Sequence, residues 1–366
     1  MRGLQPIDRK FLLLLSAVCG FGLLMLLSAS GPLGYQTFGD SYYFFKHQLF
    51  FGFFPGLAIF YVLSRIDYRK LRSVAALGLF LSVLLLVMVY MPGIGLKLGG
   101  SERWVKVFGL AFQPSEFVKV TFLLYMSVWL AARKQEAKTV QEGLMPFLFA
   151  TGIVGLLLIL QPNTGSMSVI VISAVMMYMI AGAPWGWFAL MGAGGVGLLA
   201  LLIKLTPYRA ARFMTFLHPE LDPKGIGYHI NQAFLAIGSG GLFGLGYGHS
   251  RQKFLYLPEV AGDSVFAVMA EEMGYFITVA FIVLMGFFVR RIITIAENAP
   301  DEFGRYLATG IGSWIAVQTV LNISSMMGLL PMTGVTLPFV SYGSSAFLAL
   351  AMGMGLVASI SRQSRL

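Results

Sequence analysis

Long apolar runs separated by short polar segments recur along nearly the whole sequence. A run of about 20 apolar residues is long enough to cross a bilayer as an α-helix. The pattern predicts ten membrane-spanning helices, at residues 11–30, 44–64, 71–91, 115–132, 142–161, 165–182, 185–204, 263–289, 303–326 and 340–361. We therefore expect an all-α polytopic membrane protein in which residues 1–366 form a single integral membrane domain.

Basic residues set the expected orientation of these helices. The first apolar run follows a basic segment and lacks a clear cleavage site, so we interpret it as a retained helix rather than a signal peptide. With the N-terminus in the cytoplasm, basic clusters at both termini and in three internal loops fall on the cytoplasmic side. The clusters are Arg2, Arg9 and Lys10; Arg65, Arg69, Lys70 and Arg72; Arg133, Lys134 and Lys138; Arg290, Arg291 and Arg305; and Arg362 and Arg365.

Composition supports the same class of protein. Hydrophobic residues make up 57% of the chain and charged residues 11%, and the mean hydropathy is +0.78. The net charge of +10 could suggest nucleic-acid binding, but membrane topology explains the short basic clusters better. Cys19 is the only cysteine, which excludes an internal disulfide and a cysteine-based metal site.

Other basic residues lie where the predicted topology disfavours them. The third-to-fourth connection and the long seventh-to-eighth connection, about residues 205–262, are expected to be extracytoplasmic. They carry Lys97, Arg103 and Lys106, and Arg209, Arg212, Lys224, Arg251 and Lys253. Outward-facing cations favour an anionic ligand, with simple solvation in a long loop as the alternative. The long connection is too apolar for disorder and contains an amphipathic stretch at 228–237, so we expect it to fold onto the membrane surface.

A polar segment at 101–119 combines cations, an aromatic residue and a helix start. Pro114 and Ser115 are typical of the first residues of a helix. Glu116 and Lys119 stand three residues apart on one helical face and could neutralise each other, so structural and functional interpretations of this pair stay open. Trp104 could serve as an interface anchor or as a platform on which a sugar stacks.

Several further polar features have structural explanations. The breaks at 161–165 and 333–345 are turns unless they line a cavity. Asn322 and Ser325 are typical interhelical hydrogen-bonding groups. The glycine-rich segment 238–248 lacks the strand and helix of a nucleotide-binding loop, which favours tight turns or close backbone approach. The histidines, which show no metal-ligand spacing and are expected at surfaces or interfaces, are His47, His218, His229 and His249.

Asp263 is the residue that most needs an explanation. It follows Gly262 and precedes an apolar run, so an exposed helix N-cap is the simplest interpretation. A carboxylate against lipid is costly, however, which favours a function. Glu271 and Glu272 follow in the same run, with Glu271 on nearly the same face as Asp263 and about 12 Å deeper. We expect one of the two glutamates to be a buried structural partner.

Motifs in a fixed order resemble those of the SEDS family, in particular the FtsW/RodA group, over nearly the whole chain. They are Arg103-Trp104, Gln113-Pro114-Ser115-Glu116, Gln161-Pro162, the segment 237–244, Arg251-Gln252-Lys253, Leu257-Pro258-Glu259, Phe266-Ala267-Val268 with Glu271-Glu272, and the segment 337–343. The Arg251-Gln252-Lys253 motif is more similar to the FtsW branch. The chain departs from the family pattern at Ala261-Gly262, where His-Thr is common, and at Asn163, where an acid is frequent.

The resemblance implies a peptidoglycan glycosyltransferase of the bacterial inner membrane. Such a protein polymerises lipid II into β-1,4 glycan strands on the outer face, in division or elongation. Its partners would be a class B penicillin-binding protein acting as transpeptidase and other divisome or elongasome membrane proteins, and not nucleic acid. The resemblance assigns catalysis to Asp263; substrate binding to Arg103, Trp104, Lys106, Glu116, Lys119, Arg212, Arg251, Lys253 and Ser341; and structural support to Glu259, Glu271 and Glu272.

The expected chemistry is transfer from an α-linked polyprenyl diphosphate donor to a GlcNAc 4-hydroxyl by single displacement with inversion. A divalent cation, Mg or Mn, is compatible with this reaction, although the sequence contains no closed metal site. A lipid II flippase or transporter, and a noncatalytic scaffold for the transpeptidase, are the alternatives. A transporter would be expected to carry paired broken helices in two corresponding halves, whereas the polar motifs here concentrate on one side.

Overall fold

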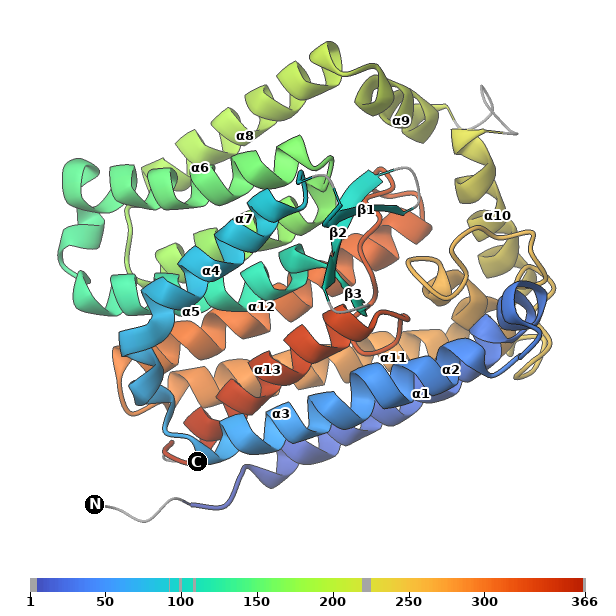
Figure 1. Cartoon of the computed structure of the whole chain (residues 1–366), viewed down its shortest axis with the longest axis horizontal. Helices are drawn as coiled ribbons and strands as arrows, with labels where there is room; N and C mark the ends of the chain where they lie inside the picture. Colours follow the sequence, from blue (N-terminus) through green and yellow to red (C-terminus); the bar gives the residue numbers. More distant parts are fainter. Residues whose placement is uncertain (1–4, 92, 99–100, 108–109, 219–224, 365–366) are drawn as a thin grey trace.

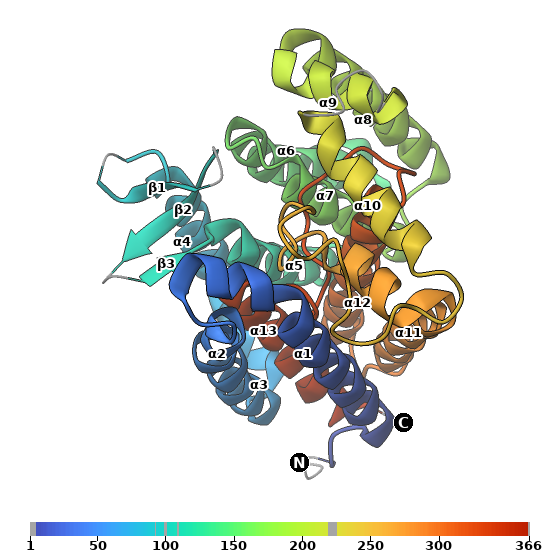
Figure 2. The same ribbon diagram turned by 90° about the vertical axis from the view of Figure 1, so that its right-hand side faces the viewer.

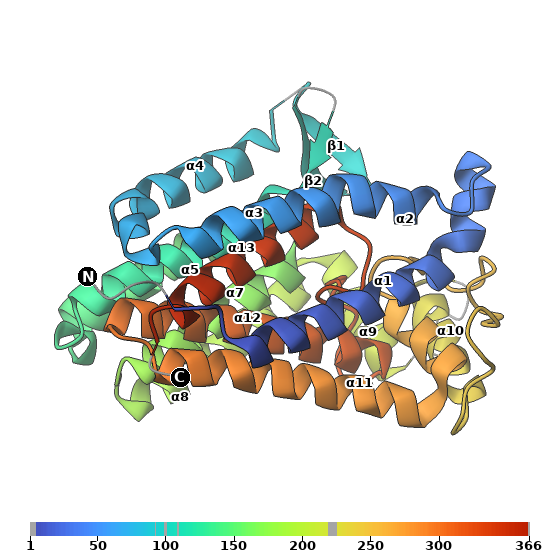
Figure 3. The ribbon, with the colours of Figure 1, turned by 90° about the horizontal axis from the view of Figure 1, so that it is seen from below.

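The computed structural model describes residues 5–91, 93–98, 101–107, 110–218 and 225–364. Long helices run roughly side by side, and both termini lie at the same end of the bundle (Figures 1 and 3). Helix α10 and the loop that follows it lie at the opposite end. Arg2, Lys224 and Arg365, which the sequence analysis singled out, fall outside the described residues.

Helical structure occurs at every predicted apolar run. The long helices are α1 (Arg9–Phe38), α3 (Phe54–Arg65), α4 (Ala75–Met88), α5 (Pro114–Ala132), α6 (Met145–Leu160), α7 (Thr164–Ile180), α8 (Trp185–Leu205), α11 (Val265–Glu297), α12 (Glu302–Met326) and α13 (Ser344–Ser361). Helix α2 (Tyr43–Gln48) continues through the π-turn Leu49–Phe53 into α3, and the 3₁₀ turn Tyr68–Val74 precedes α4. The 3₁₀ turn Glu136–Lys138 and the π-turn Val140–Leu144 precede α6.

Eight helical segments within the described part of the chain are long and apolar enough to cross a membrane. This finding confirms a multi-pass α-helical membrane architecture. Helices α7 and α12 are not among the eight; α7 is apolar but has only 17 residues.

The helix ends follow from the local sequence. Asp8 caps α1 by accepting a hydrogen bond from the Phe11 backbone N–H at 2.7 Å, and α1 stops at Gly39, whose φ of 70° is left-handed. The predicted helix start at Pro114 is confirmed, with Glu116 in the first turn of α5. Asn163 caps α7 through its side chain, so the polar break at 161–165 is a helix-to-helix turn.

The core lies around α12 and α13. Helix α12 packs against α5, α7 and α11, while α13 packs against α3 and α5 (Figure 2). Trp314 of α12 is fully buried there. Helix α8 lies at the periphery and has no buried residue, so lipid must cover most of its surface (Figures 1 and 2).

A small antiparallel sheet corrects the all-α prediction. Strands β1 (Gly95–Leu98), β2 (Ser101–Val107) and β3 (Leu110–Phe112) pair in that order. The sequence pattern predicts only a connection between two helices here. The alternation of a strand is nevertheless visible in β2, where Val105 is buried and the next residue, Lys106, is exposed.

The long connection before α11 is ordered into helices where the structure describes it. The amphipathic stretch at 228–237 is confirmed as part of α10 (Ile226–Ser239). Helix α9 (Pro207–Leu217) was not predicted. Together α9 and α10 carry Arg212 and His229 toward the start of α11, where Asp263 lies.

Candidate functional site

Asp263 lies in a tight turn just before α11. The N-cap residue of α11 is Ser264, and no side chain caps the helix, so the interpretation of Asp263 as an N-cap is wrong. Ser264 Oγ donates to the Pro258 carbonyl at 2.7 Å, and the Ser264 N–H donates to the Glu259 carbonyl at 3.2 Å. These bonds close the turn and leave the Asp263 side chain available for other contacts.

Two other segments hold the backbone of this turn. The Asn322 Nδ2 group donates to the Asp263 carbonyl at 2.8 Å. The Tyr342 N–H donates to the Ala261 carbonyl at 2.7 Å. The turn is thereby fixed to α12 and to the polar segment before α13, both distant from it in the sequence.

The Asp263 carboxyl group is poised to exchange a proton near neutral pH. Burial, reinforced by the negative charge of Glu259, raises its pKa to about 7, while its own backbone N–H and the Arg212 guanidinium oppose the shift. Its Oδ1 atom is buried without a hydrogen-bond partner in the described part of the chain. A carboxylate with these properties suits a general base.

Arg212 and His229 accompany Asp263. Arg212 Nη1 of α9 donates to the Met332 carbonyl at 3.1 Å. His229 of α10 lies 2.5 Å from Ser264 Oγ. Because that hydroxyl donates to the Pro258 carbonyl, His229 Nε2 is the donor in this pair. Burial, assisted by Arg212, lowers the pKa of His229 to about 4, so its imidazole is neutral at physiological pH.

The sequence analysis expects His229 at a surface or interface, outside the candidate site. The structure instead places it beside Ser264, next to Asp263. Its spacing from the other histidines carried no signal, because α10 reaches the turn through the fold rather than through sequence proximity. The amphipathic pattern of α10 was the one available hint that its inner face would meet the bundle.

Arg103 ties the small sheet to the break at 161–165. Its Nε atom donates to the Gln161 carbonyl at 3.2 Å, and its Nη2 atom donates to the Pro162 carbonyl. The neighbouring Trp104 is half-buried and Lys106 is exposed. Arg209 similarly donates to the Ile159 carbonyl at 3.0 Å. Arg103 and Arg209 therefore border the polar break.

Glu116 and Lys119 form an ion pair, as expected if the two residues neutralise each other. Lys119 Nζ lies 2.9 Å from Glu116 Oε2, and both side chains are buried. The same ammonium donates to Gln318 Oε1 at 2.9 Å and lies over the Trp314 ring. This ion pair is therefore part of the helical core and is connected to α12.

Ser341 lies in the polar segment before α13, where its Oγ accepts a hydrogen bond from the Leu337 N–H at 2.8 Å. This bond closes a turn that is buried against the bundle. Within the sequence-predicted set, Asp263, Glu259 and Arg212 come together electrostatically, whereas Ser341 is held by its own turn.

The resemblance predicts structural support from both Glu271 and Glu272, and both bind residues of other segments of the chain. Glu271 accepts hydrogen bonds from Ser250 Oγ and from the backbone N–H groups of Arg251 and Gln252, at 3.0 Å and 3.3 Å for the latter two. Glu272 lies 2.7 Å from Lys253 Nζ and accepts a bond from Ser28 Oγ at 2.7 Å. The two carboxylates fix the 250–253 turn to α11.

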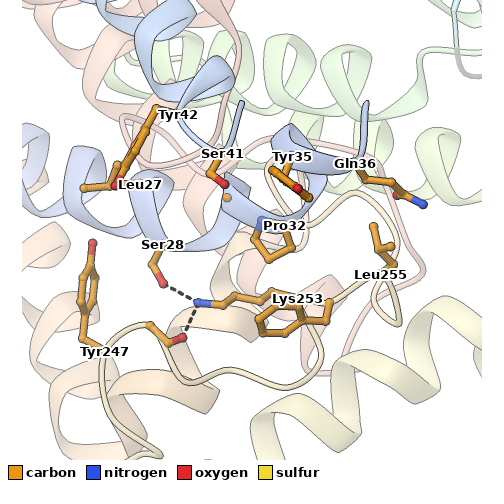
Figure 4. A pocket seen from close by; sticks show the side chains of 13 residues that line it. Leu27, Ser28, Pro32, Tyr35, Gln36, Ser41, Tyr42, Tyr247, Lys253 and Leu255 are labelled. Atoms are coloured by element: carbon orange, nitrogen blue, oxygen red, sulfur yellow. Dashed lines mark hydrogen bonds between the residues drawn. The ribbon is translucent and has the colours of Figure 1, made fainter. Parts of the chain in front are cut away.

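Lys253 is therefore buried, and its ammonium group already has several partners. Figure 4 shows its ammonium directed at Ser28 and at a backbone carbonyl, that of Gly248 at 2.8 Å. A pocket of about 650 Å³ opens beside it between α1 and the 247–255 loop. Asp263 does not line this pocket. Arg251, by contrast, is exposed.

The backbone of the glycine-rich segment is in direct hydrogen-bond contact with the backbone of α11. Helix α11 is interrupted at Gly274, whose φ of 73° is left-handed. Across the break, the N–H groups of Leu245 and Gly246 donate to the carbonyls of Glu271 and Glu272 at 2.9 Å and 3.0 Å. The prediction of close backbone approach is confirmed, and the neighbour is a helix of the same chain.

No group of three or more His, Cys, Asp or Glu side chains in the described ranges is arranged to hold a metal ion. The predicted substrate-binding roles are not tested by these contacts and stay predictions for Arg103, Trp104, Lys106, Glu116, Lys119, Arg212, Arg251, Lys253 and Ser341.

Comparisons with known proteins converge on one family. A family model described as a cell cycle protein, FtsW/RodA/SpoVE, matches residues 9–366. Stage V sporulation protein E of Bacillus subtilis is 37% identical, covering 94% of this chain and 94% of its own length. The probable peptidoglycan glycosyltransferase FtsW of Trichlorobacter lovleyi is also 37% identical, covering 98% of this chain and 94% of its own.

Solved structures share the architecture. A chain from work on the structural coordination of polymerization and crosslinking by a peptidoglycan synthase complex superposes with a TM-score of 0.80 at 27% identity, covering 97% of this chain and 98% of that one. The rod shape determining protein RodA of Thermus thermophilus superposes with a TM-score of 0.71 at 26% identity, covering 98% of each chain.

Proposed function

The chain belongs to the FtsW/RodA/SpoVE family, and from this premise we propose that it is a peptidoglycan glycosyltransferase that polymerises lipid II into β-1,4 glycan strands. The observation that carries the proposal is Asp263, a carboxyl group with a pKa of about 7 in a turn held by α12 and faced by Arg212. A noncatalytic scaffold needs no such group, whereas a transporter uses carboxyl groups as proton relays, so the lipid-flipping assay described below separates that alternative.

The reaction is a single displacement with inversion. The 4-hydroxyl oxygen of a GlcNAc residue attacks the anomeric carbon of the α-linked polyprenyl diphosphate donor. The new β-1,4 C–O bond forms as the bond to the diphosphate breaks, and the diphosphate leaves with the bonding electron pair. Asp263 accepts the hydroxyl proton as the nucleophile loses it.

Cations in this part of the fold suit the leaving group. Arg212 and Arg103 carry guanidinium forks, which match phosphate oxygens well. Both are anchored to backbone carbonyls, Arg212 to Met332 and Arg103 to Gln161 and Pro162. Anchored cations stabilise developing charge without large reorganisation.

A divalent cation, Mg or Mn, fits the acidic side of this site. Mg²⁺ is usually held by one or two carboxylates together with substrate phosphates. Glu259 would hold it together with the substrate phosphates, which leaves Asp263 available as the proton acceptor; Glu259 is near enough to raise the pKa of Asp263. Such an ion would offset negative charge on the diphosphate when bound.

We propose that the site faces the outer side of a bacterial inner membrane crossed by ten helices, with both termini cytoplasmic. Support comes from ion pairs at the terminal end, such as Arg69 with Asp301 at 2.7 Å and Lys134 with Glu302 at 2.8 Å. These residues belong to the basic loops that the positive-inside rule assigns to the cytoplasm. Helix α7 and the polar α12 would complete the ten.

The partner would be a class B penicillin-binding protein that cross-links the strands, alongside other membrane proteins of the division or elongation machinery. The similar chain from a complex of polymerization and crosslinking supports a partner of this kind. The FtsW relatives and the Arg251-Gln252-Lys253 motif favour a role in division.

Substitution Asp263→Asn tests the proposal. We expect the purified variant, reconstituted with its partner transpeptidase and fluorescent lipid II, to lose at least about 100-fold in polymerisation rate, because the amide cannot accept the proton. The matched control is Asp40→Asn, which removes a carboxylate bound to Lys46 in the connection after α1. If the folded Asp263→Asn variant made glycan strands at the normal rate, the catalytic assignment would be contradicted. A lipid-flipping assay in liposomes separates the transporter alternative.

A further inference from the structure

Helix α12 presents two amide side chains one turn apart to the same polar segment. Gln318 Nε2 donates to the Thr336 carbonyl at 2.9 Å. Asn322 Nδ2 donates to the Val335 carbonyl at 2.7 Å and to the Asp263 carbonyl at 2.8 Å. Residues four apart share one face of a helix, so the amides act on neighbouring points of one surface.

The orientation of the Asn322 amide is fixed by its partners. An amide NH₂ group has two hydrogens, and both are directed at backbone carbonyls, which can only accept. Turning the amide over would place its oxygen against two other oxygens. Asn322 Oδ1 is buried and has no partner in the part of the chain that the structure describes.

These contacts differ from those expected of an interhelical hydrogen-bonding residue. Neither acceptor belongs to a helix: Val335 lies in the segment between α12 and α13, and Asp263 precedes the cap of α11. Asn322 therefore joins two non-helical segments, one of which carries the proposed catalytic carboxylate. Its effect on Asp263 passes through the main chain of Asp263 itself.

Gln318 connects the same segment to the buried ion pair. Its Oε1 atom accepts hydrogen bonds from Lys119 Nζ at 2.9 Å and from Trp314 Nε1 at 2.6 Å. Both the oxygen and the nitrogen of the Gln318 amide therefore have partners. Through this amide, Thr336 is connected to Lys119 and its ion-pair partner Glu116. Movement of the 335–336 segment would disturb both amides together.

We propose that Asn322 is a positioning residue of the glycosyl-transfer site, which holds the Asp263 main chain at a fixed place against residues 335–336. Gln318 supports the same arrangement through the Glu116–Lys119 pair. The inference rests on the proposed function, since it assigns a purpose to the exact placement of Asp263. A base must lie within hydrogen-bond reach of its proton, and a misplacement of about 1 Å can cost about 100-fold in rate.

The test compares Asn322→Leu with the wild type in lipid II polymerisation. We expect kcat to fall about 100-fold and KM for lipid II to stay within about twofold. Asn322→Gln, which keeps an NH₂ group, should recover part of kcat. Thr319→Val is the matched control, because Thr319 is buried on the same helix and, among the described residues, its hydroxyl bonds only the Ile315 carbonyl of that helix, at 2.7 Å.

The split between kcat and KM separates positioning from a purely structural role. Loss of protein stability in Asn322→Leu with normal kcat for the folded fraction would overturn the inference, as would an Asn322→Gln variant whose kcat stays as low as that of Asn322→Leu. An inactive wild type would instead refute the proposed function, so the two failures are distinguishable.

Discussion

At the scale of single residues, Asp263 shows what a sequence can and cannot specify. Its carboxylate was recognisable as costly, and the family motifs favoured catalysis over a helix cap. Its contacts were not predictable, because His229, Asn322 and Tyr342 reach the turn from other elements. The chain lacks the family's histidine at Ala261-Gly262, yet the turn still meets an imidazole, supplied by α10.

Contacts from distant elements also explain why the sequence predicts a substrate-binding role for Lys253. A lysine in a long connection has no visible partner in the sequence. Its partners, Ser28 and Glu272, belong to two different helices, so the ion pair exists only in the fold.

The raised pKa of Asp263 predicts how the rate depends on pH. The pKa rises from 3.8 to about 7, so the carboxylate is lost as pH falls through about 7. Because the base is the ionised form, kcat/KM should fall about tenfold per pH unit below pH 6 and level off above pH 8. Polymerisation rates measured between pH 5 and pH 9 check this. An acid limb near pH 4 would show that Asp263 titrates as an ordinary carboxyl.

At the scale of elements, apolar helices were predictable and the backbone pairings between them were not. Hydropathy alone located each long apolar helix, because a spanning helix must satisfy its own backbone groups, whereas α9 carries no such signal. Strand β2 and the break at Gly274 depend on partners elsewhere in the fold. Gly274 is one of 43 glycines, and nothing in its neighbours marks it as left-handed.

Close approach at the break makes its glycines intolerant of side chains. A Cβ atom at Gly244 would lie 2.2 Å from the Glu272 carbonyl oxygen, and the φ of Gly244 is +79°. We expect Gly244→Ala to lower the free energy of unfolding by about 1–3 kcal/mol. Thermal unfolding in detergent measures the change.

The control for this substitution is Gly238→Ala. Gly238 lies in α10 with open space around its Cβ position. Alanine there should leave stability unchanged or raise it by up to about 1 kcal/mol. Equal behaviour of the two variants would argue that the glycine contacts with α11 do not matter.

At the scale of the whole molecule, the two ends of the bundle have different characters. The end with the termini is cross-linked by ion pairs, including Asp8 with Arg291. The other end carries α10, the glycine-rich segment and the turn with Asp263. This polarity agrees with one end facing the cytoplasm and the other the cell-wall side.

Cysteine labelling tests that orientation. In a Cys19→Ser background, Tyr256→Cys should react with a membrane-impermeant maleimide in intact spheroplasts, because Tyr256 is exposed in the loop before α11. Lys138→Cys should react only after the membrane is permeabilised, as expected for a cytoplasmic loop. The reverse pattern would invert the proposed topology.

The break in α11 also bears on how the protein is made. The N–H of Tyr275 is satisfied by the Gly241 carbonyl at 2.9 Å, so this helix cannot complete its backbone bonding alone. The glycine-rich segment is synthesised before α11, and in the proposed topology it has to cross the membrane to reach its place beside that helix. An unpaired backbone group is costly in lipid. Helix α11 therefore needs the loop in place to accept the hydrogen bond of the Tyr275 N–H. In the proposed topology, insertion of α11 therefore depends on export of the loop.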